Sequence, residues 1–396
     1  MTVAQGYHNL IPVTNLSPPV DTTQPYDPST LAGKTVLITG GALGLGAAFA
    51  REWASHGANV IVGDINPSAG EALVAELRAE YSKRGGGAGQ EGGKGGSHHF
   101  VTCDVTSWES QVSFFKEGAR LSPNGAIDVV VANAGVNEPG ANGRFEMPLA
   151  SSSDPDAPRE PSTKIIDVNI TGLSYTTHLA LFWLPRNGNS TGAGVGGTPR
   201  DRCLLLVGSV AGVGHFPGQA PYTMSKHAVT GLFRAMRGTA YLRHRVRMNM
   251  VCPYFVSGSQ MFPGAAEAAL LGGGAGGAQG RDVVDAATRL VADEGVVGRA
   301  LLVGPEVDAL GLVEEDEDGE VMMVGRKGGK VAVWDVYAED YKDCEAFVWR
   351  WIRVLNTVEY VRGWTGWIGD VFSILTRPVR GGRQAAILHD DHVRSL

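Results

Sequence analysis

A glycine cluster at residues 39–46, which reads TGGALGLG, limits more than any other feature what this chain can fold into. It follows a short apolar run and precedes a stretch of helical composition at 47–56. Backbone N–H groups at a helix N-terminus can hold a dinucleotide pyrophosphate, provided that no side chain blocks its approach. Gly40, Gly44 and Gly46 give that access. The order of strand, turn and helix therefore predicts a dinucleotide-binding unit.

Apolar runs alternate with helical patterns over most of the remaining chain. The expected strands are 35–39, 58–63, 99–102, 127–132, 203–207, 246–252 and 300–303. The expected helices are 47–56, 68–82, 164–184, 222–242 and 284–292. Strands that are apolar almost throughout are typical of a parallel sheet covered by helices on both faces. We therefore expect an α/β fold, a Rossmann-like doubly wound parallel sheet of about seven strands, with a helical C-terminal extension.

The chain divides by composition into an arm, a domain and an extension. The apolar residues of 1–30 show no helical or strand periodicity, so we expect an extended arm that is poorly ordered or lies on the surface. The Rossmann domain is expected at 31–305. The extension is expected at 306–396, as a turn or hairpin followed by aromatic amphipathic helices. Four stretches inside the domain have loop composition: 85–97, 137–163, 186–201 and 264–280. The last of these is either a plain surface insertion or a mobile lid over the substrate.

Composition excludes several classes of protein. The net charge of −7 argues against a nucleic-acid binder, which would carry a basic face. The histidines show no metal-ligand spacing, so we expect no metal site. No secretory signal and no run of 18 apolar residues is found, which makes a cytoplasmic location the expectation. The four cysteines form no CxxC pair, which agrees with reduced thiols: Cys103, Cys203, Cys252 and Cys344.

Asp64 carries the prediction about the cofactor. It ends the second expected strand, where an acid can accept hydrogen bonds from the adenosine ribose hydroxyls and repel a 2′-phosphate. No Arg or Lys lies within the glycine turn to pair with such a phosphate. We therefore favour NAD(H), with NADP(H) not excluded. The alternative is a solvated loop acid without a role in binding.

Three polar residues stand in an arrangement that suits proton transfer. Tyr222 and Lys226 are spaced i and i+4, which places them on one face of a helix. Ser209 comes 13 residues before Tyr222, directly after an expected strand. A free tyrosine has a pKa of about 10, and a nearby ammonium group favours its phenolate form. The pattern therefore predicts Tyr222 as a general acid/base, with Lys226 as its charged neighbour and Ser209 holding the substrate oxygen.

These motifs together resemble the short-chain dehydrogenase/reductase family. The matching segments occur in family order: TGGALGLG at 39–46, Asp64, CDV at 103–105, ANAG at 132–135, DVN at 167–169, GSVAG at 208–212, YTMSK at 222–226 and NMVCPYFV at 249–256. The resemblance covers about residues 31–305. The chain is similar to fungal members of the family, including 15-hydroxyprostaglandin-dehydrogenase-like and secondary-metabolite enzymes.

The resemblance implies further roles. Asn169 would complete the catalytic group by holding a water that links Lys226 to solvent, and Lys226 would also bind the nicotinamide ribose. The implied cofactor-binding residues are Gly40, Gly44, Leu45, Gly46, Asp64, Asp104, Val105, Asn133, Ala134, Gly135, Tyr222, Lys226 and Val256. Two positions depart from the family pattern: Tyr254 stands where a glycine is usual, and Gly258 where a hydroxyl residue is usual. Tyr254 instead becomes a candidate for the pocket wall.

An aromatic stripe marks the extension. Its apolar residues repeat at helical spacing: Cys344, Phe347, Val348, Trp351, Ile352, Leu355 and Val358. Three interpretations stay open: a packing face against the domain or a second subunit, a wall of the substrate pocket, or a helix on a membrane surface. Membrane contact is the weakest of these because the charges of the stripe are mixed.

The leading hypothesis is an NAD(H)-dependent oxidoreductase that interconverts a secondary alcohol and a ketone on an apolar small molecule, as the resemblance to fungal secondary-metabolite enzymes implies. One alternative is an enzyme of another class on the same scaffold, such as a dehydratase, an isomerase or a redox-assisted cyclase. A further alternative is a non-catalytic NAD-binding regulator. The expected partners are the small-molecule substrate and further copies of the chain, as a dimer or tetramer.

Overall fold

The computed structural model describes residues 17–83, 96–188, 200–214, 216–258, 276–308, 312–315, 321–324 and 330–336, together with positions 357, 360, 361 and 364. The chain forms two compact units, one of residues 10–344 and the other of residues 1–9 with 345–396. The account below concerns the first unit.

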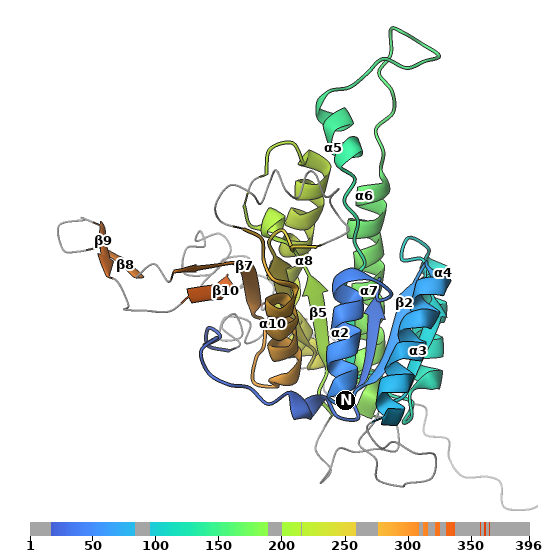
Figure 1. Ribbon diagram of the computed structural model, residues 1–396, viewed down its shortest axis with the longest axis vertical. Helices are drawn as coiled ribbons and strands as arrows, with labels where there is room; N and C mark the ends of the chain where they lie inside the picture. The colour runs from blue at the N-terminus through green and yellow to red at the C-terminus, as the bar shows by residue number, and fades with distance from the viewer. Residues whose placement is uncertain are drawn as a thin grey trace, which may run out of the picture. The chain divides into compact units, whose positions relative to one another are not determined.

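An eight-stranded sheet forms the centre of this unit (Figure 1). Its strands are β1 (Thr35–Thr39), β2 (Asn59–Asp64), β3 (His98–Thr102), β4 (Val129–Ala132), β5 (Cys203–Val207), β6 (Arg247–Pro253), β7 (Ala300–Asp308) and β10 (Lys330–Val336). Their order is β10-β7-β6-β5-β4-β1-β2-β3, and all neighbours are parallel except β10 and β7. The doubly wound α/β fold is therefore confirmed.

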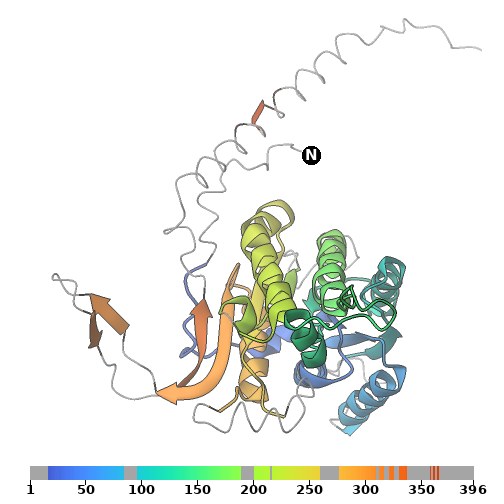
Figure 2. The ribbon, with the colours of Figure 1, turned by 90° about the horizontal axis from the view of Figure 1, so that it is seen from above.

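Helices cover both faces of the sheet, as the view from above shows (Figure 2). One face carries α2 (Gly44–Ser55), α3 (Pro67–Lys83) and α10 (Gly280–Ala292). The other carries α4 (Trp108–Leu121), α7 (Leu173–Trp183) and α8 (Ala220–His244). The shorter helical segments are η2 (Pro28–Leu31), α5 (Pro139–Glu146), α6 (Lys164–Ile166), η3 (Asp167–Gly172), η4 (Leu184–Gly188) and η5 (Val210–Gly212).

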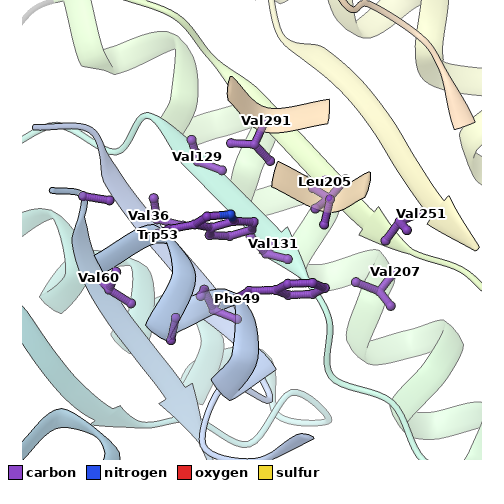
Figure 3. Packing of buried hydrophobic residues seen from close by; sticks show 14 of the residues in the cluster. Val36, Phe49, Trp53, Val60, Val129, Val131, Leu205, Val207, Val251 and Val291 are labelled. Carbon is purple, nitrogen blue, oxygen red and sulfur yellow. The ribbon is translucent and has the colours of Figure 1, made fainter. Parts of the chain in front are cut away.

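The core under α2 is built around two stacked rings. Phe49 and Trp53 lie 5.3 Å apart between ring centroids, and both are fully buried against valines of β1, β2 and β4 (Figure 3). The indole of Trp53 donates to Thr288 Oγ1 of α10 at 2.8 Å, so its one polar atom is satisfied. Burying a large apolar side chain contributes about 1.5–3 kcal/mol. This packing fixes α2, and with it the glycine turn at its start.

The part of the N-terminal arm that the structure describes lies along α10 and the β10 edge of the sheet. Tyr26 Oη donates to Asp285 Oδ1 of α10 at 2.8 Å. The N–H of Val20 donates to Asp335 Oδ2 of β10 at 2.8 Å. These contacts tie residues 17–31 to elements that are far away in the sequence.

Strand β10 is the eighth strand, which the sequence did not lead us to expect. It pairs antiparallel with β7, which runs on to Asp308 instead of ending near Val303. Between β7 and β10 the chain forms a hairpin of β8 (Leu312–Glu315) and β9 (Val321–Val324). The aromatic stripe at 344–358 lies outside the described residues except Thr357, as does the greater part of the proposed lid at 264–280.

A truncation series tests the contribution of β10. A chain that ends at Cys344 keeps the strand, and a chain that ends at Gly329 loses it together with the ring of Trp334, which packs directly on the backbone of Gly304. The loss exposes β7 as an edge and removes half-buried side chains. We expect the shorter chain to be less stable by about 2 kcal/mol. Its melting temperature should fall accordingly, by about 2–4 °C for each kcal/mol. Equal melting temperatures of the two chains would contradict this role.

Candidate active site

The turn requires glycine at Gly44 and at Gly46 for two different reasons. Gly44 has φ 55°, a left-handed conformation that favours glycine, and α2 begins at this residue. A Cβ at Gly46 would lie 2.3 Å from the carbonyl oxygen of Gly40, so no other residue fits there. The turn therefore has the form that a bound pyrophosphate requires at a helix N-terminus.

Hydrogen bonds from the end of β4 hold the glycine turn in place. Asn133 Nδ2 donates to the carbonyl oxygens of Thr39 and Gly40, at 3.0 and 2.7 Å. The N–H groups of Asn133 and Ala134 donate to Thr39 Oγ1 at 3.2 and 3.3 Å. The neighbouring ends of β1 and β4 are thus joined into one surface, which brings together two of the segments that the sequence analysis assigned to the cofactor.

Asp64 stands at the end of β2, beside the same turn. Its carboxylate accepts the N–H of Ala42 at 3.0 Å through Oδ2 and the N–H of Asn66 at 3.0 Å through Oδ1. At the C-terminal end of the neighbouring strand β3, Asp104 is exposed and Val105 is buried against Gly172. These residues follow neighbouring strands, as predicted.

Ser209, Tyr222 and Lys226 come together near the C-terminal end of β5. Ser209 follows β5, and Tyr222 and Lys226 lie in the first two turns of α8. All three are buried. The Nζ atom of Lys226 lies 5.8 Å from the centre of the Tyr222 ring and donates to the carbonyl oxygen of Val207 at 3.1 Å.

Burial dominates the acid–base properties of these groups. It raises the pKa of the Tyr222 phenol, while the hydrogen bond with Ser209 acts in the opposite direction. Burial also lowers the pKa of Lys226 to about 8. Cys252 has a pKa raised by burial to about 12, so its thiol stays neutral. Forming a phenolate at Tyr222 therefore requires positive charge close to it.

Asn169 lies in the π-helical segment η3 before α7 and is buried. Its Oδ1 accepts the N–H of Val136 at 2.8 Å, and its Nδ2 donates to the carbonyl of Val136 at 2.9 Å and to Ser225 Oγ at 3.0 Å. A Cβ at Gly135 would lie 3.4 Å from Asn169 Oδ1 and 3.6 Å from Lys226 Nζ, so both groups face Gly135. The water-holding role of Asn169 stays a prediction.

The segment after β6 carries the two departures from the family pattern. Tyr254 packs edge-on against Phe255 at 4.9 Å between ring centroids, and Phe216 lies 5.8 Å from Phe255. We call Phe216, Tyr254 and Phe255 the aromatic trio. Gly258 has φ 74°, so the backbone conformation itself favours glycine at this position. Val256 pairs with Ala278 in an isolated parallel bridge.

The predicted site residues thus lie at the C-terminal ends of the parallel strands. Within the described residues no group of three or more potential metal ligands is found. In the same part of the chain no helix is long and apolar enough to cross a membrane. Sequence reasoning missed two features of the site: Phe216 as a member of the trio, and the buried Asn142 of α5, which contacts the backbone of Tyr222. Neither stands in a motif, and no local signal would have found them.

Comparisons with known proteins agree with this geometry. The family model described as short chain dehydrogenase matches residues 34–269. The 5'-hydroxyaverantin dehydrogenase of Emericella nidulans is 35% identical over 318 residues, which cover 76% of this chain and 93% of that protein. The corresponding enzyme of Dothistroma septosporum is 33% identical over 304 residues, 74% of this chain and 91% of that protein. NADP-dependent dehydrogenase M3 of a Phoma species is 31% identical over 280 residues, 69% and 76% of the two chains.

The chain therefore belongs to the short-chain dehydrogenase/reductase family, as its motifs led us to expect. It is an oxidoreductase of the class that uses a nicotinamide dinucleotide. The choice between NAD and NADP and the identity of the substrate are taken up next.

Proposed function

We propose that the protein uses NAD(H) to interconvert a secondary alcohol and a ketone on an apolar small molecule of fungal secondary metabolism. One observation carries this proposal: Ser209 and Tyr222 are both buried and interact closely enough for Ser209 to lower the pKa of the phenol, and Lys226 Nζ lies 5.8 Å from the centre of the Tyr222 ring. Proton transfer to or from a substrate oxygen needs such a group in a site that excludes water.

Each group of the site has a separate role in the proposed reaction. The nicotinamide, when bound, would take a hydride from the carbinol carbon of the alcohol or give one to the carbonyl carbon of the ketone. Tyr222 Oη gives or takes the proton of the substrate oxygen, and Ser209 Oγ donates a hydrogen bond to the same oxygen. Lys226 opposes the effect of burial on Tyr222, because its positive charge favours the phenolate. The glycine turn, which admits no side chain at Gly46, fits the pyrophosphate of the cofactor.

Asp64 supports NAD(H) over NADP(H). Its carboxylate is fixed at the end of β2 by the N–H of Ala42, beside the turn that would hold the pyrophosphate. A 2′-phosphate there would meet a negative charge, and residues 40–46 contain no Arg or Lys to neutralise it. Some relatives are named as NADP-dependent, so this preference is open to direct test.

The cofactor preference is tested by fluorescence titration with NADH and NADPH. We expect NADH to bind more tightly than NADPH. In Asp64→Ala we expect the ratio of the Kd for NADPH to the Kd for NADH to fall by about 10-fold, equivalent to about 1.4 kcal/mol. Glu76→Ala is the matched control, because it removes an exposed carboxylate that is paired with Arg51 away from the turn. Equal or tighter binding of NADPH by the unmodified protein would refute the preference for NAD(H).

The aromatic trio supports a planar apolar substrate. Tyr254 and Phe255 directly follow Pro253, whose carbonyl oxygen accepts from Ser209 Oγ at 3.5 Å, so the rings begin next to a catalytic group. Aromatic side chains favour offset or edge-on contact with other rings, at about 0.5–1.5 kcal/mol beyond burial. Two of the relatives are named for 5'-hydroxyaverantin, which makes that compound the first candidate.

The proposed reaction is tested by incubating the protein with NAD and a panel of secondary alcohols, and anaerobically with NADH and the matching ketones. The panel includes 5'-hydroxyaverantin, and products are identified by mass spectrometry. We expect NAD to be reduced in step with the loss of two hydrogens from the alcohol. A product formed by loss of water or without change of mass would refute the proposal in favour of a dehydratase, isomerase or cyclase. Cofactor binding without any product would favour a regulator.

A further inference from the structure

Helix α8, which carries Tyr222 and Lys226, does not supply its own N-terminal cap. Its N-cap residue Gln219 makes no capping hydrogen bond with its side chain. The first N–H groups of a helix have no partner within the helix and need one from elsewhere. Here the partners come from α5, some 80 residues earlier: Glu146 Oε1 accepts the N–H of Ala220 at 3.2 Å, and Asn142 Oδ1 accepts the N–H of Tyr222 at 3.3 Å. The direct neighbourhood of α5 and the start of α8 can be followed in Figure 1.

Asn142 is the buried member of this pair. Its exposed fraction is 0%, and its Nδ2 donates to Asn137 Oδ1 at 2.7 Å. Asn137 in turn donates through Nδ2 to Gln219 Oε1 at 3.3 Å. The amide of Asn142 thus links the N–H of Tyr222 to the segment that follows β4, and both of its polar atoms are bonded.

The carbonyl group of Tyr222 is held from the same segment. Ser225 Oγ donates to this carbonyl at 2.7 Å and accepts from Asn169 Nδ2 at 3.0 Å. Asn169 is in turn bound to both backbone groups of Val136, the neighbour of Asn137. Hydrogen bonds therefore connect the segment after β4 to the N–H of Tyr222 through Asn142 and to its carbonyl through Asn169.

We propose that Asn142 is a positioning residue for Tyr222: by accepting the N–H of Tyr222 it fixes the first turn of α8, and with it the phenol, relative to the end of β4. The proposal rests on the proposed function, in which Tyr222 moves the proton. It assigns to α5, which the sequence analysis placed in a loop insertion, a direct part in the geometry of the active site.

The physical reason is that the N–H of Tyr222 lies in the first turn of α8 and has no partner within the helix. Pro221 has no N–H, and the N–H of Thr223 is bonded within the turn, to the carbonyl of Gln219 at 2.8 Å. Without the oxygen of Asn142, the N–H of Tyr222 would be buried and unpaired, which is unfavourable, so the turn would move to find another partner. A displacement of about 1 Å at a reacting group can lower the rate by about 10²-fold.

The test uses two substitutions in the full-length protein that keep the number and branching of the side-chain heavy atoms. Asn142→Leu removes both hydrogen bonds, and Asn142→Asp keeps an oxygen that can accept the N–H of Tyr222. For Leu we expect kcat to fall by about 10- to 100-fold with the substrate that the panel identifies, while the Kd for NADH changes by less than about 3-fold. For Asp we expect most of kcat to return. An Asp variant as slow as the Leu variant, or a Leu variant with unchanged kcat, would overturn the proposal.

Asn187→Leu is the matched control. Asn187 is equally buried, and its Nδ2 donates to Asp128 Oδ1 at 3.1 Å, but it lies near the start of β4 and β5, at the end of the sheet opposite the site. We expect this variant to be less stable and yet to keep its kcat when folded. An equal loss of kcat in the two Leu variants would mean general destabilisation and would overturn the positioning role.

Hydrogen exchange measured by mass spectrometry gives a readout that needs no substrate. In Asn142→Leu we expect the amides at the start of α8 to exchange at least about 10-fold faster, while those of β5 and β6 keep their protection. Unchanged exchange would overturn the proposal whatever the kinetics show. If the unmodified protein turns over no panel substrate, the proposed function fails, while faster exchange at the start of α8 in Asn142→Leu would still show that Asn142 fixes this turn. Slow kinetics confined to Asn142→Leu would support both proposals.

Discussion

Replacing Tyr222 with phenylalanine is expected to lower kcat by about 10²-fold or more, the scale of general acid–base catalysis. The substitution keeps the buried ring and removes only the hydroxyl group. Because the ring is retained, we expect the Kd for NADH to change by less than about 2-fold, or about 0.4 kcal/mol. The measurement is kcat at saturating substrate together with a fluorescence titration of NADH.

Tyr254→Phe is the control for this prediction. Tyr254 also belongs to the site and is half-buried in the aromatic trio, but its proposed contribution is the ring and not the hydroxyl. Loss of its hydroxyl should therefore leave kcat within about 3-fold, or about 0.7 kcal/mol. A Tyr222→Phe enzyme with the turnover of the unmodified protein would show that another group moves the proton.

The central strands could be predicted because of their environment. Parallel strands covered on both faces must be apolar at nearly every position, as the five buried residues of β1 and of β5 show. Such runs stand out in the sequence without knowledge of their neighbours. The strand β10 gives no such signal, because it lies at an edge with only half-buried side chains. Its place depends on the extension of β7 and on the contact of Asp335 with the N-terminal arm, and both are non-local.

In the site, too, the features with a local sequence pattern could be predicted, and those that depend on non-local contacts could not. Tyr222 and Lys226 could be paired from their spacing on one helix, and Ser209 from its position directly after a strand. Their chemistry is therefore encoded locally. The cap on Tyr222 could not be predicted, because Asn142 lies in a stretch with loop composition and meets its partner only after the chain has folded. A residue that acts through backbone contacts carries no motif.

Replacing Asp201 with asparagine is expected to destabilise the fold by about 3–5 kcal/mol, the cost of removing one partner of a buried ion pair. Asp201 is buried between two cations: its carboxylate lies 2.7 Å from Arg247 Nη2 and 3.0 Å from Lys34 Nζ, with only 6% of its side chain exposed. Arg247 would keep its bonds to backbone carbonyls, such as that of Leu290, but would lose its counter-charge. The measurement is the free energy of unfolding in urea at neutral pH.

The pH dependence of this effect follows from the charge of Asp201. Burial alone would raise the pKa of its carboxyl, but the bonds with Arg247 and Lys34 outweigh burial and hold the pKa at about 2. Since an unfolded aspartate has a pKa of about 3.9, the stabilisation is complete above that value and is lost as the pH falls through about 2. The difference in stability between the unmodified protein and Asp201→Asn should therefore be constant from neutral pH down to about 4 and shrink below it.

Glu294→Gln separates burial from charge in this experiment. Glu294 also pairs with Lys34, at 2.8 Å, but 56% of its side chain is exposed. An exposed ion pair contributes at most about 1 kcal/mol, because water screens it. We therefore expect Glu294→Gln to be much less harmful than Asp201→Asn, although both remove one negative charge next to the same lysine. Equal losses would mean that burial of Asp201 between Lys34 and Arg247 does not strengthen its ion pairs, and these pairs would then not be what stabilises this end of the sheet.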